Sequence, residues 1–269
     1  MRSVSSSRAL SRFVTMLVAL SLPVLATGAE AEAAPAPAAP GVIVNATLAS
    51  QYISRGFRQG WGKPALQAGA DYAHPSGWSA GTWMSSVSNR YIENGSLEVD
   101  LYGGYSGSAG AFGYSMLVYY YVYPGAEYKA TATTYDYGEL SFGMTWKMLY
   151  AKYNHTFTPE FFGITNARGT GYLDVGANID LGAGMTLQLH AGNGRVAGAG
   201  NAVWDWNDAK IGLSKVYSAG WTATAAMTKA FPRTAIYDNY TLGIPNSGGV
   251  IETSNPGKAT LVLSITKTF

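Results

Sequence analysis

Cysteine is absent from the 269 residues, which excludes a disulfide framework and any zinc or iron–sulfur site built on thiolate ligands. Charged residues are scarce at 13% of the chain, whereas soluble domains carry nearer a quarter. No basic run follows the N-terminal leader, so the pI of 8.6 does not indicate a nucleic-acid partner. After the leader, no apolar run approaches the roughly 18 residues that a membrane-spanning helix needs.

The chain is rich in glycine, with 33 residues, and in aromatic side chains, at 13%. Hydrophobic residues make up 47%, yet the mean hydropathy is only +0.02, so apolar and small polar residues are interleaved rather than segregated into blocks. Intrinsic disorder is excluded, because disordered chains are poor in aromatic residues and rich in charge.

The N-terminus has the three parts of an export signal, which are basic residues, an apolar stretch at 13–25 and small residues after it. We expect a signal peptide at residues 1–29, cleaved after Ala29, with the alanines at 31 and 33 as alternatives. An uncleaved anchor helix is disfavoured, because the apolar stretch is short and contains a proline. Residues 30–41 then form a Pro/Ala-rich linker, and residues 42–269 form the folded domain, with 15 basic and 14 acidic side chains.

From residue 42 onward, apolar and polar residues alternate with a period of two, which is typical of strands with one apolar and one polar face. Val44, Leu48 and Tyr52 share one face of the first segment, and Asn45 and Thr47 share the other. Twelve such segments can be counted, beginning near residues 42, 64, 78, 97, 111, 135, 148, 170, 185, 207, 221 and 258.

The connections between the segments alternate in length. Short ones lie at 74–77, 107–110, 147–148, 182–184 and 218–220, and long ones at 55–63, 88–96, 125–134, 158–169, 195–206 and 231–257. Short periplasmic turns and long extracellular loops are typical of an all-β transmembrane antiparallel β-barrel with an even number of strands, here about 12. Such a barrel has a backbone diameter on the order of 24 Å, which leaves a narrow lumen.

Aromatic side chains mark the short-turn ends of the segments. Each has the parity of its segment's apolar stripe, and they are Tyr72, Trp78, Tyr105, Phe112, Trp146, Tyr217, Trp221 and Phe269. A soluble core gives no reason to place rings at one height, whereas membrane barrels carry aromatic girdles at the interface. The sequence therefore predicts a barrel in the bacterial outer membrane.

Several stretches of the first half resemble a known family. They are QYISRGFRQ at 51–59, KPALQ at 63–67, DYAHPSG at 71–77, GTWMS at 81–85, LEVDLYGGYSG at 97–107 and YYYVYPG at 119–125. Together these motifs resemble the TorF-type porin family, a group of bacterial outer-membrane proteins described as of unknown function. The resemblance covers mainly residues 50–145. It implies an outer-membrane location and a channel role, and it supplies no catalytic residues.

The chain ends in alternating apolar residues, with Leu263, Ile265 and Phe269 on one face, which resembles the signal read by the outer-membrane assembly machinery. Lys267 departs from that pattern, although a lysine near the membrane edge can snorkel to water. We therefore expect the assembly machinery as a partner through this segment. Outer-membrane lipid, lipopolysaccharide and small solutes are the other expected partners, and nucleic acid is not.

The polar stripe carries the candidate pore-lining residues. Acids outnumber bases among them, which predicts a mild preference for cations. They are Arg55, Asp71, Glu98, Asp100, Glu139, Lys152, Asp174, His190, Asp208 and Lys210. The same charges can instead brace a narrow barrel as ion pairs, and Lys152 and Asp174 lie on neighbouring segments where they can pair.

Two local features have more than one interpretation. Glu98 and Asp100 have the spacing of a carboxylate pair or a calcium site, but no loop of alternating acidic oxygens accompanies them, so neither a metal nor another cofactor is expected. The stretch Arg55–Arg58 leads into the first long loop. It can bind lipopolysaccharide phosphates, or Gly56 can simply form a bend, and the bend is favoured.

The sequence as a whole predicts a porin-like channel, not an enzyme, through which small solutes diffuse passively. One alternative is a lipid-modifying hydrolase that uses His155 near the membrane boundary with Ser141, but no G-x-S-x-G motif and no orienting acid support it. A second alternative is a non-conducting structural or adhesive barrel that acts through the loop 231–257. Whether that loop folds inward as a plug is left open by the sequence.

Overall fold

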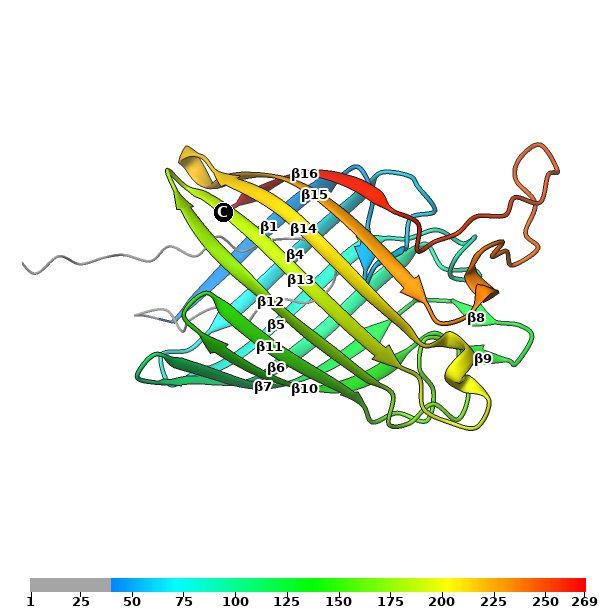
Figure 1. Cartoon of the computed structure of the whole chain (residues 1–269), viewed down its shortest axis with the longest axis horizontal. Coiled ribbons are helices and arrows are strands. Elements are labelled where there is room, and N and C mark those ends of the chain that lie inside the picture. The colour runs from blue at the N-terminus through cyan, green and yellow to red at the C-terminus, as the bar shows by residue number, and fades with distance from the viewer. Residues whose placement is uncertain (1–39) are drawn as a thin grey trace, which may run out of the picture.

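The computed structural model describes residues 40–269; the predicted signal peptide and nearly all of the predicted linker lie outside this range. Within it, twelve strands form one closed antiparallel barrel (Figure 1). They are β1 (Gly41–Ala49), β4 (Ala65–Ala73), β5 (Trp78–Ser86), β6 (Leu97–Ala109), β7 (Phe112–Val122), β10 (Tyr137–Trp146), β11 (Leu149–Thr156), β12 (Gly171–Gly182), β13 (Met185–Arg195), β14 (Trp206–Val216), β15 (Trp221–Pro232) and β16 (Thr260–Thr268). The predicted fold class is confirmed, and each predicted segment begins within two residues of a barrel strand.

The barrel closes between its first and last strands. β1 pairs with β4 on one side and with β16 on the other, in a register that sets Asn45 opposite Thr268 and Ala49 opposite Ser264. The backbone N–H of Phe269 adds a hydrogen bond to the carbonyl of Val44 at 2.9 Å. Every barrel strand therefore has two partners, as hydrocarbon requires, because an unpaired backbone group there costs several kcal/mol.

The outer wall is apolar. Val44, Leu66 and Phe142 lie on it and are exposed, whereas Asn45 and Gln67, the next residues along the chain, face inward and are buried. No described helix is long and apolar enough to cross a membrane. A wall of exposed aliphatic and aromatic side chains around a polar interior suits hydrocarbon rather than water.

The short turns gather at one end of the barrel and the long loops at the other (Figure 1). The aromatic residues of the short-turn end point outward, as predicted. Phe112 stacks on Trp146 with ring centroids 6.1 Å apart, and Trp78 meets Tyr105 edge to face at 5.5 Å.

Lysines accompany this aromatic belt. Lys267 lies over the rings of Trp221 and Phe269, at 5.8 and 5.2 Å from the centroids, and Lys147 lies 4.8 Å from the centroid of Trp146. Lys267 therefore keeps its ammonium group at the membrane edge, where the outward stripe meets water. This accounts for its departure from the usual apolar residue of the terminal segment.

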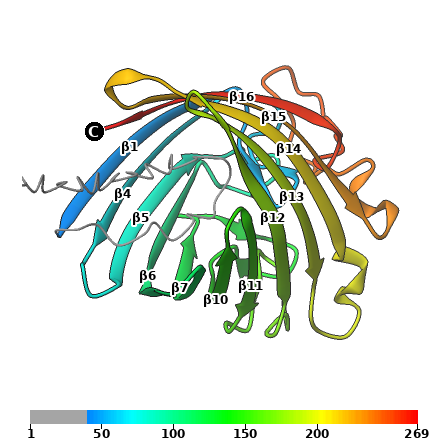
Figure 2. The same ribbon diagram turned by 60° about the vertical axis from the view of Figure 1, so that its left-hand side comes forward.

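The long-loop end carries the remaining elements. Two small hairpins pair β2 (Ile53–Ser54) with β3 (Phe57–Arg58) and β8 (Glu127–Tyr128) with β9 (Thr133–Thr134). The short 3-10 helices η1 (Asn201–Trp204) and η3 (Ala235–Tyr237) belong to outer loops, and η2 (Ser218–Gly220) forms a turn at the opposite end. Figure 2 shows how strongly the strands tilt around the barrel.

Buried aromatic residues of the outer loops form a cluster with inward rings of the barrel strands. Phe162 packs against Tyr91, Tyr123 and Tyr135 with ring centroids 5.2–5.7 Å apart, and Phe161 packs against Tyr137 at 4.8 Å. The core of the molecule therefore sits in the mouth of the barrel rather than between two sheets.

Tyr52 corrects one sequence expectation. Its parity predicts a place on the apolar outer stripe, but β1 ends at Ala49, and Tyr52 is fully buried inside the barrel mouth. Its ring lies 5.3 Å from that of Trp83, and its hydroxyl donates to Glu98 at 3.0 Å. The parity argument fails because it holds only while the chain remains a strand.

Candidate functional site in the barrel interior

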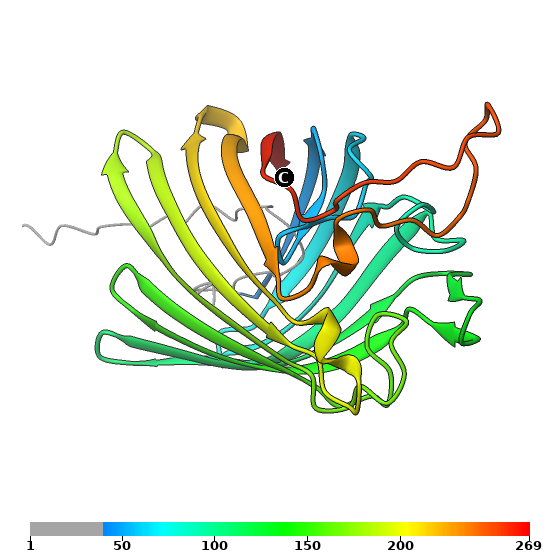
Figure 3. The same cartoon turned by 45° about the vertical axis from the view of Figure 1, so that its right-hand side comes forward.

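The first outer loop, residues 50–64, folds into the lumen (Figure 3). Its hairpin of β2 and β3 turns at Arg55 and Gly56, which have φ values of 46° and 85°. A Cβ atom on Gly56 would lie 2.6 Å from the Cβ of Asp208 and 3.0 Å from that of Ala230. Glycine therefore allows the turn to press directly against β14 and β15. The bend at Gly56 is confirmed, but it points into the barrel.

Arg55 ties the tip of this hairpin to the opposite wall. Its Nη1 and Nη2 donate to the two carboxylate oxygens of Glu139 on β10, at 3.0 and 2.5 Å. The guanidinium also lies 4.5 Å from the ring centroid of Tyr172 on β12. Thr156 donates to Glu139 at 3.3 Å. The Arg55 side chain is 8% exposed and that of Glu139 is 0% exposed, so this bidentate pair is almost fully desolvated.

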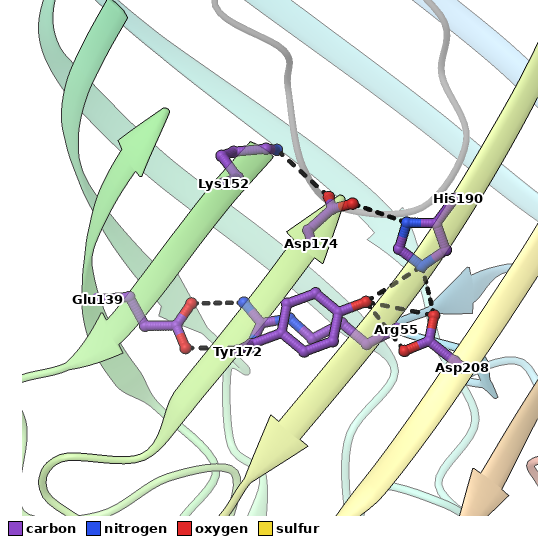
Figure 4. A network of polar contacts seen from close by, with 7 residues as sticks. All are labelled: Arg55, Glu139, Lys152, Tyr172, Asp174, His190 and Asp208. Atoms are coloured by element: carbon purple, nitrogen blue, oxygen red, sulfur yellow. Dashed lines mark hydrogen bonds and ion pairs between the residues drawn. The ribbon is translucent and has the colours of Figure 1, made fainter. Parts of the chain in front are cut away.

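Next to the Arg55–Glu139 pair, a row of polar contacts crosses the wall from β11 to β14 (Figure 4). Asp174 lies 3.9 Å from Lys152 through Oδ2 and 2.7 Å from His190 Nδ1 through Oδ1. The predicted pairing of Lys152 with Asp174 is thereby confirmed, since the two residues are also directly opposite in the strand register. His190 Nε2 lies 2.5 Å from Asp208 Oδ1, and the Tyr172 hydroxyl donates to Asp208 Oδ2 at 3.0 Å.

His190 has a carboxylate at each ring nitrogen. A ring protonated on both nitrogens can donate to Asp174 and Asp208 at once, whereas either neutral tautomer can donate to only one of them. Tyr172 links this row of polar contacts to the Arg55–Glu139 pair, because its hydroxyl contacts Asp208 and its ring contacts Arg55. The hairpin tip thus rests on a continuous network that spans β10 to β14.

The remaining acids lie on the other side of the lumen. Glu98 and Asp100 point inward from β6 and are buried, and Glu98 accepts from Tyr52. Asp71 on β4 accepts from the Tyr102 hydroxyl at 2.5 Å. Among the described residues, no three His, Cys, Asp or Glu side chains are arranged to hold a metal ion.

The base of the hairpin is held by the last outer loop, residues 233–259. Phe57 packs against Tyr237 and Trp206, with ring centroids 4.7 and 5.6 Å apart. Arg58 donates to Ser254 Oγ at 2.5 Å and to the Asn255 carbonyl at 2.9 Å. The first loop thus occupies the lumen, and segment 254–257 of the last loop fastens it there.

Burial also sets the titration of the loop tyrosines. Loss of solvent raises the pKa of Tyr91, Tyr237 and Tyr240 well above its ordinary value, and it raises the pKa of Tyr135 to about 12. These hydroxyls stay neutral over the ordinary pH range, so the aromatic cluster carries no phenolate charge into the mouth.

The structure places all ten candidate pore-lining residues inside the barrel. Six meet in the hairpin-tip network, namely Arg55, Glu139, Lys152, Asp174, His190 and Asp208. Lys210 lies beside them on β14, opposite His190 in the register. Asp71, Glu98 and Asp100 form the separate acidic side on β4 and β6.

Three tyrosines of the interior donate to carboxylates, namely Tyr52 to Glu98, Tyr102 to Asp71 and Tyr172 to Asp208. The alternation of the sequence sets Tyr102 on the polar stripe with Glu98 and Asp100, and the structure agrees. Sequence reasoning missed Tyr172, although its parity is that of Asp174 on the same strand, and it misplaced Tyr52. His155, by contrast, lies near the outer end of β11 opposite Leu140, and its ring is 6.5 Å from that of Tyr153.

Comparison with known proteins agrees with this architecture. A family model described as a bacterial protein of unknown function, Gcw_chp, matches residues 32–269. No curated protein sequence matches the chain.

Two solved structures with a similar fold are porins. The KdgM porin superposes with a TM-score of 0.53 at 6% identity, over 84% of this chain and 99% of its own. The NanC porin superposes with a TM-score of 0.50 at 8% identity, over 85% and 99%. At such low identity the likeness shows the fold, a closed barrel of outer-membrane channel type.

Proposed function

The chain belongs to the Gcw_chp family, and on that premise we propose that it is an outer-membrane channel for passive diffusion of small solutes. The observation that carries this proposal is the closed barrel with an apolar outer wall and a charged interior. The barrel would lie in the bacterial outer membrane with its short turns in the periplasm, after export by the predicted signal peptide. The resemblance to TorF-type porins supports the same role.

We infer a mild cation preference for the open channel. Asp71, Glu98 and Asp100 line one side of the interior, and no basic side chain among the ten candidates lies on the strands that carry them. On the other side, Arg55 neutralises Glu139 and Lys152 neutralises Asp174. The acidic side therefore sets the net potential that a permeating ion meets.

The inward hairpin makes this channel restricted rather than wide. The tip at Arg55 and Gly56 reaches the wall at Glu139 and Asp208, so flux requires that the hairpin moves or that solutes pass beside it. The proposed activity is passive and needs no cofactor or catalytic residue. The proposed partners are outer-membrane lipid, lipopolysaccharide, the assembly machinery through the segment ending in Phe269, and small solutes.

Conductance of the refolded barrel in planar bilayers tests the proposal. We expect discrete single-channel steps and, in a potassium chloride gradient, a reversal potential of the sign that indicates cation preference. Glu98→Gln with Asp100→Asn should move that potential toward zero, whereas Lys147→Gln at the outside of the short-turn end should leave it unchanged. If neither the wild type nor a variant lacking the hairpin contact (Arg55→Ala) shows conductance steps, the channel proposal is wrong and a structural or adhesive barrel is favoured.

Hydrolysis is tested separately on the same preparation. The proposal expects no release of fatty acid from phospholipid or lipopolysaccharide substrates. Hydrolysis by wild type that His155→Ala abolishes would establish the enzyme instead.

A further inference from the structure

Three cationic side chains lie on the outside of the barrel wall, towards its loop end. Arg195 ends β13, Arg233 directly follows β15, and Lys229 lies in the loop-side third of β15, in the register row of Ala191 and Ala209. All three are exposed, and their strands, β13 and β15, flank β14. We call these residues the outer-wall basic cluster.

The charges of this cluster are only partly neutralised. Asp205 lies between two of them, with its Oδ2 3.3 Å from Arg233 Nη1 and 4.0 Å from Arg195 Nε. Its other oxygen accepts from the backbone N–H of Val196 at 2.8 Å. The two arginine side chains remain 53% and 65% exposed, so one buried carboxylate orients both guanidinium groups while leaving their outer edges accessible.

Polar side chains continue the cluster along the wall. Asn193 faces Asn207 across the β13–β14 ladder with their amides in contact at 2.5 Å, and Asn207 faces Phe231 across the next ladder. Lys229 lies over the Phe231 ring, 4.8 Å from its centroid. The wall therefore offers hydrogen-bond donors at the height of the loops, where the outer leaflet has its headgroups.

Below the cluster the wall is hollowed. Ala177 lies between Leu149 and Leu189 in one register row, and it is buried although both leucines are exposed. Ala191 lies in the next row on the loop side. A shallow, open depression of about 510 Å³ lies at this part of the wall. Its lining includes these four residues and Val175, together with Tyr150, Gly176, His190 and Lys210.

The combination of outward cations with a groove in the wall is confined to the part of the barrel formed by β11 to β15. In the described part of the chain, no other barrel strand carries an outward Arg or Lys in its loop-side half. The comparable outward positions are apolar or aromatic, for example Leu66, Met84, Tyr120, Tyr153, Leu173 and Leu261. The outward cations at the loop end are therefore confined to the part of the circumference that also has the groove, and they do not form a uniform belt around the barrel.

We propose that this arc is a binding site for one phosphorylated lipid of the outer leaflet, of the lipid A type. Its phosphates meet Arg195 and Arg233 at the loop end, an acyl chain lies in the groove at Ala177 and Ala191, and Lys229 lies in the same register row as Ala191, where it can reach up to the phosphates. The four residue steps from Ala191 to Arg195 span about 13 Å along the strand, which matches a site that holds a headgroup and the upper part of an acyl chain. The inference rests on the outer-membrane location contained in the proposed function.

Binding of diphosphoryl lipid A to the detergent-solubilised, refolded barrel tests the site. We expect Arg195→Gln, Lys229→Gln and Arg233→Gln together to weaken binding about tenfold or more. The matched control removes the same charge at the other end, with Lys147→Gln, Lys215→Gln and Lys267→Gln, and should bind within about twofold of wild type. Equal binding by wild type and by the cluster variant overturns the proposal.

The groove and the source of the phosphate are tested by two further arms. Ala177→Leu should weaken lipid A binding several-fold, whereas Ala225→Leu, at an exposed outward position of β15, should not. Inorganic phosphate should compete only at far higher concentration than lipid A, and equal competition would overturn the lipid as ligand. Heat-dependent gel mobility confirms folding of each variant, and Lys229→Gln alone replaces the triple variant if the latter does not fold. Bilayer conductance does not enter these arms, so failure of the channel and failure of the lipid site are separable.

Discussion

Among single residues, Arg55 has the largest influence on the shape of the lumen. It lies at the tip of the inward hairpin and donates two hydrogen bonds to Glu139, and its guanidinium packs on the ring of Tyr172. Guanidinium suits this place because its planar fork matches both carboxylate oxygens and also stacks on a ring, which an ammonium group cannot do. The pair therefore fixes both the position and the orientation of the hairpin tip.

Arg55→Ala should free the hairpin tip and raise single-channel conductance. The substitution leaves Glu139 buried without its cation, and breaking a buried pair in this way costs about 3–5 kcal/mol. Arg55→Ala with Glu139→Ala should recover much of that stability while the conductance stays high. Urea unfolding in vesicles and bilayer recordings measure the two effects.

The control for this prediction is Arg168→Ala, which removes one positive charge from an exposed residue of an outer loop. It should change neither stability nor conductance. If Arg55→Ala conducts like wild type while remaining folded, the hairpin tip does not restrict the lumen.

The interior residues show which parts of a site a sequence pattern can reach. Lys152, Asp174, His190 and Asp208 lie on strands, and their parity alone places them inside. Their meeting point with Arg55 could not be predicted, because Arg55 reaches them from a loop, and the period-two rule carries no information about where a loop folds. Tyr52 was misplaced for the same reason.

At the level of elements, the hairpin of β2 and β3 is held at its base by aromatic packing rather than by strand pairing with the barrel. Phe57 contacts Tyr237 of η3 and Trp206 of β14, so it joins the hairpin both to the last outer loop and to the wall. The hairpin itself has only two residues in each strand, and such a short ribbon is not stable alone.

Phe57→Ala should make the hairpin mobile without unfolding the barrel. Loss of a buried phenylalanine costs about 3–5 kcal/mol, and that loss falls on the loop packing rather than on the ladder hydrogen bonds. We expect frequent transitions between low and high conductance and faster protease cleavage within residues 50–64. Phe231→Ala, which removes an exposed ring of the outer wall, should produce neither effect.

The strands themselves were predictable because three independent signals agree on them. Alternation gives each strand its two faces, glycine-containing turns give its end, and the outward rings give its height. β5 and β6, for example, begin at Trp78 and Leu97 as expected from the sequence. The long loops have none of these signals, so their inward packing is known only from the structure.

For the molecule as a whole, the environment of the outer wall decides the fold. The barrel exposes large apolar side chains around its full circumference and keeps its polar side chains inside. In water this arrangement would be unstable or would aggregate, whereas in a bilayer it satisfies every ladder hydrogen bond and places only the rims at the polar interface. The destabilisation caused by placing a charged side chain on the outer wall should therefore depend on how far that position lies from the rims of the barrel.

Val118→Arg tests this dependence directly. Val118 is exposed in the middle of β7, and an arginine at the bilayer midplane costs about 2–4 kcal/mol. Val42→Arg is the matched control, because Val42 is also exposed but lies opposite the girdle residue Tyr72 near the short-turn rim, where the cost falls to about 0–1 kcal/mol. Urea unfolding of both variants in phospholipid vesicles measures the difference. Equal destabilisation at the two heights would mean that the wall does not face hydrocarbon, and the channel, its location and the lipid site would all lose their common basis.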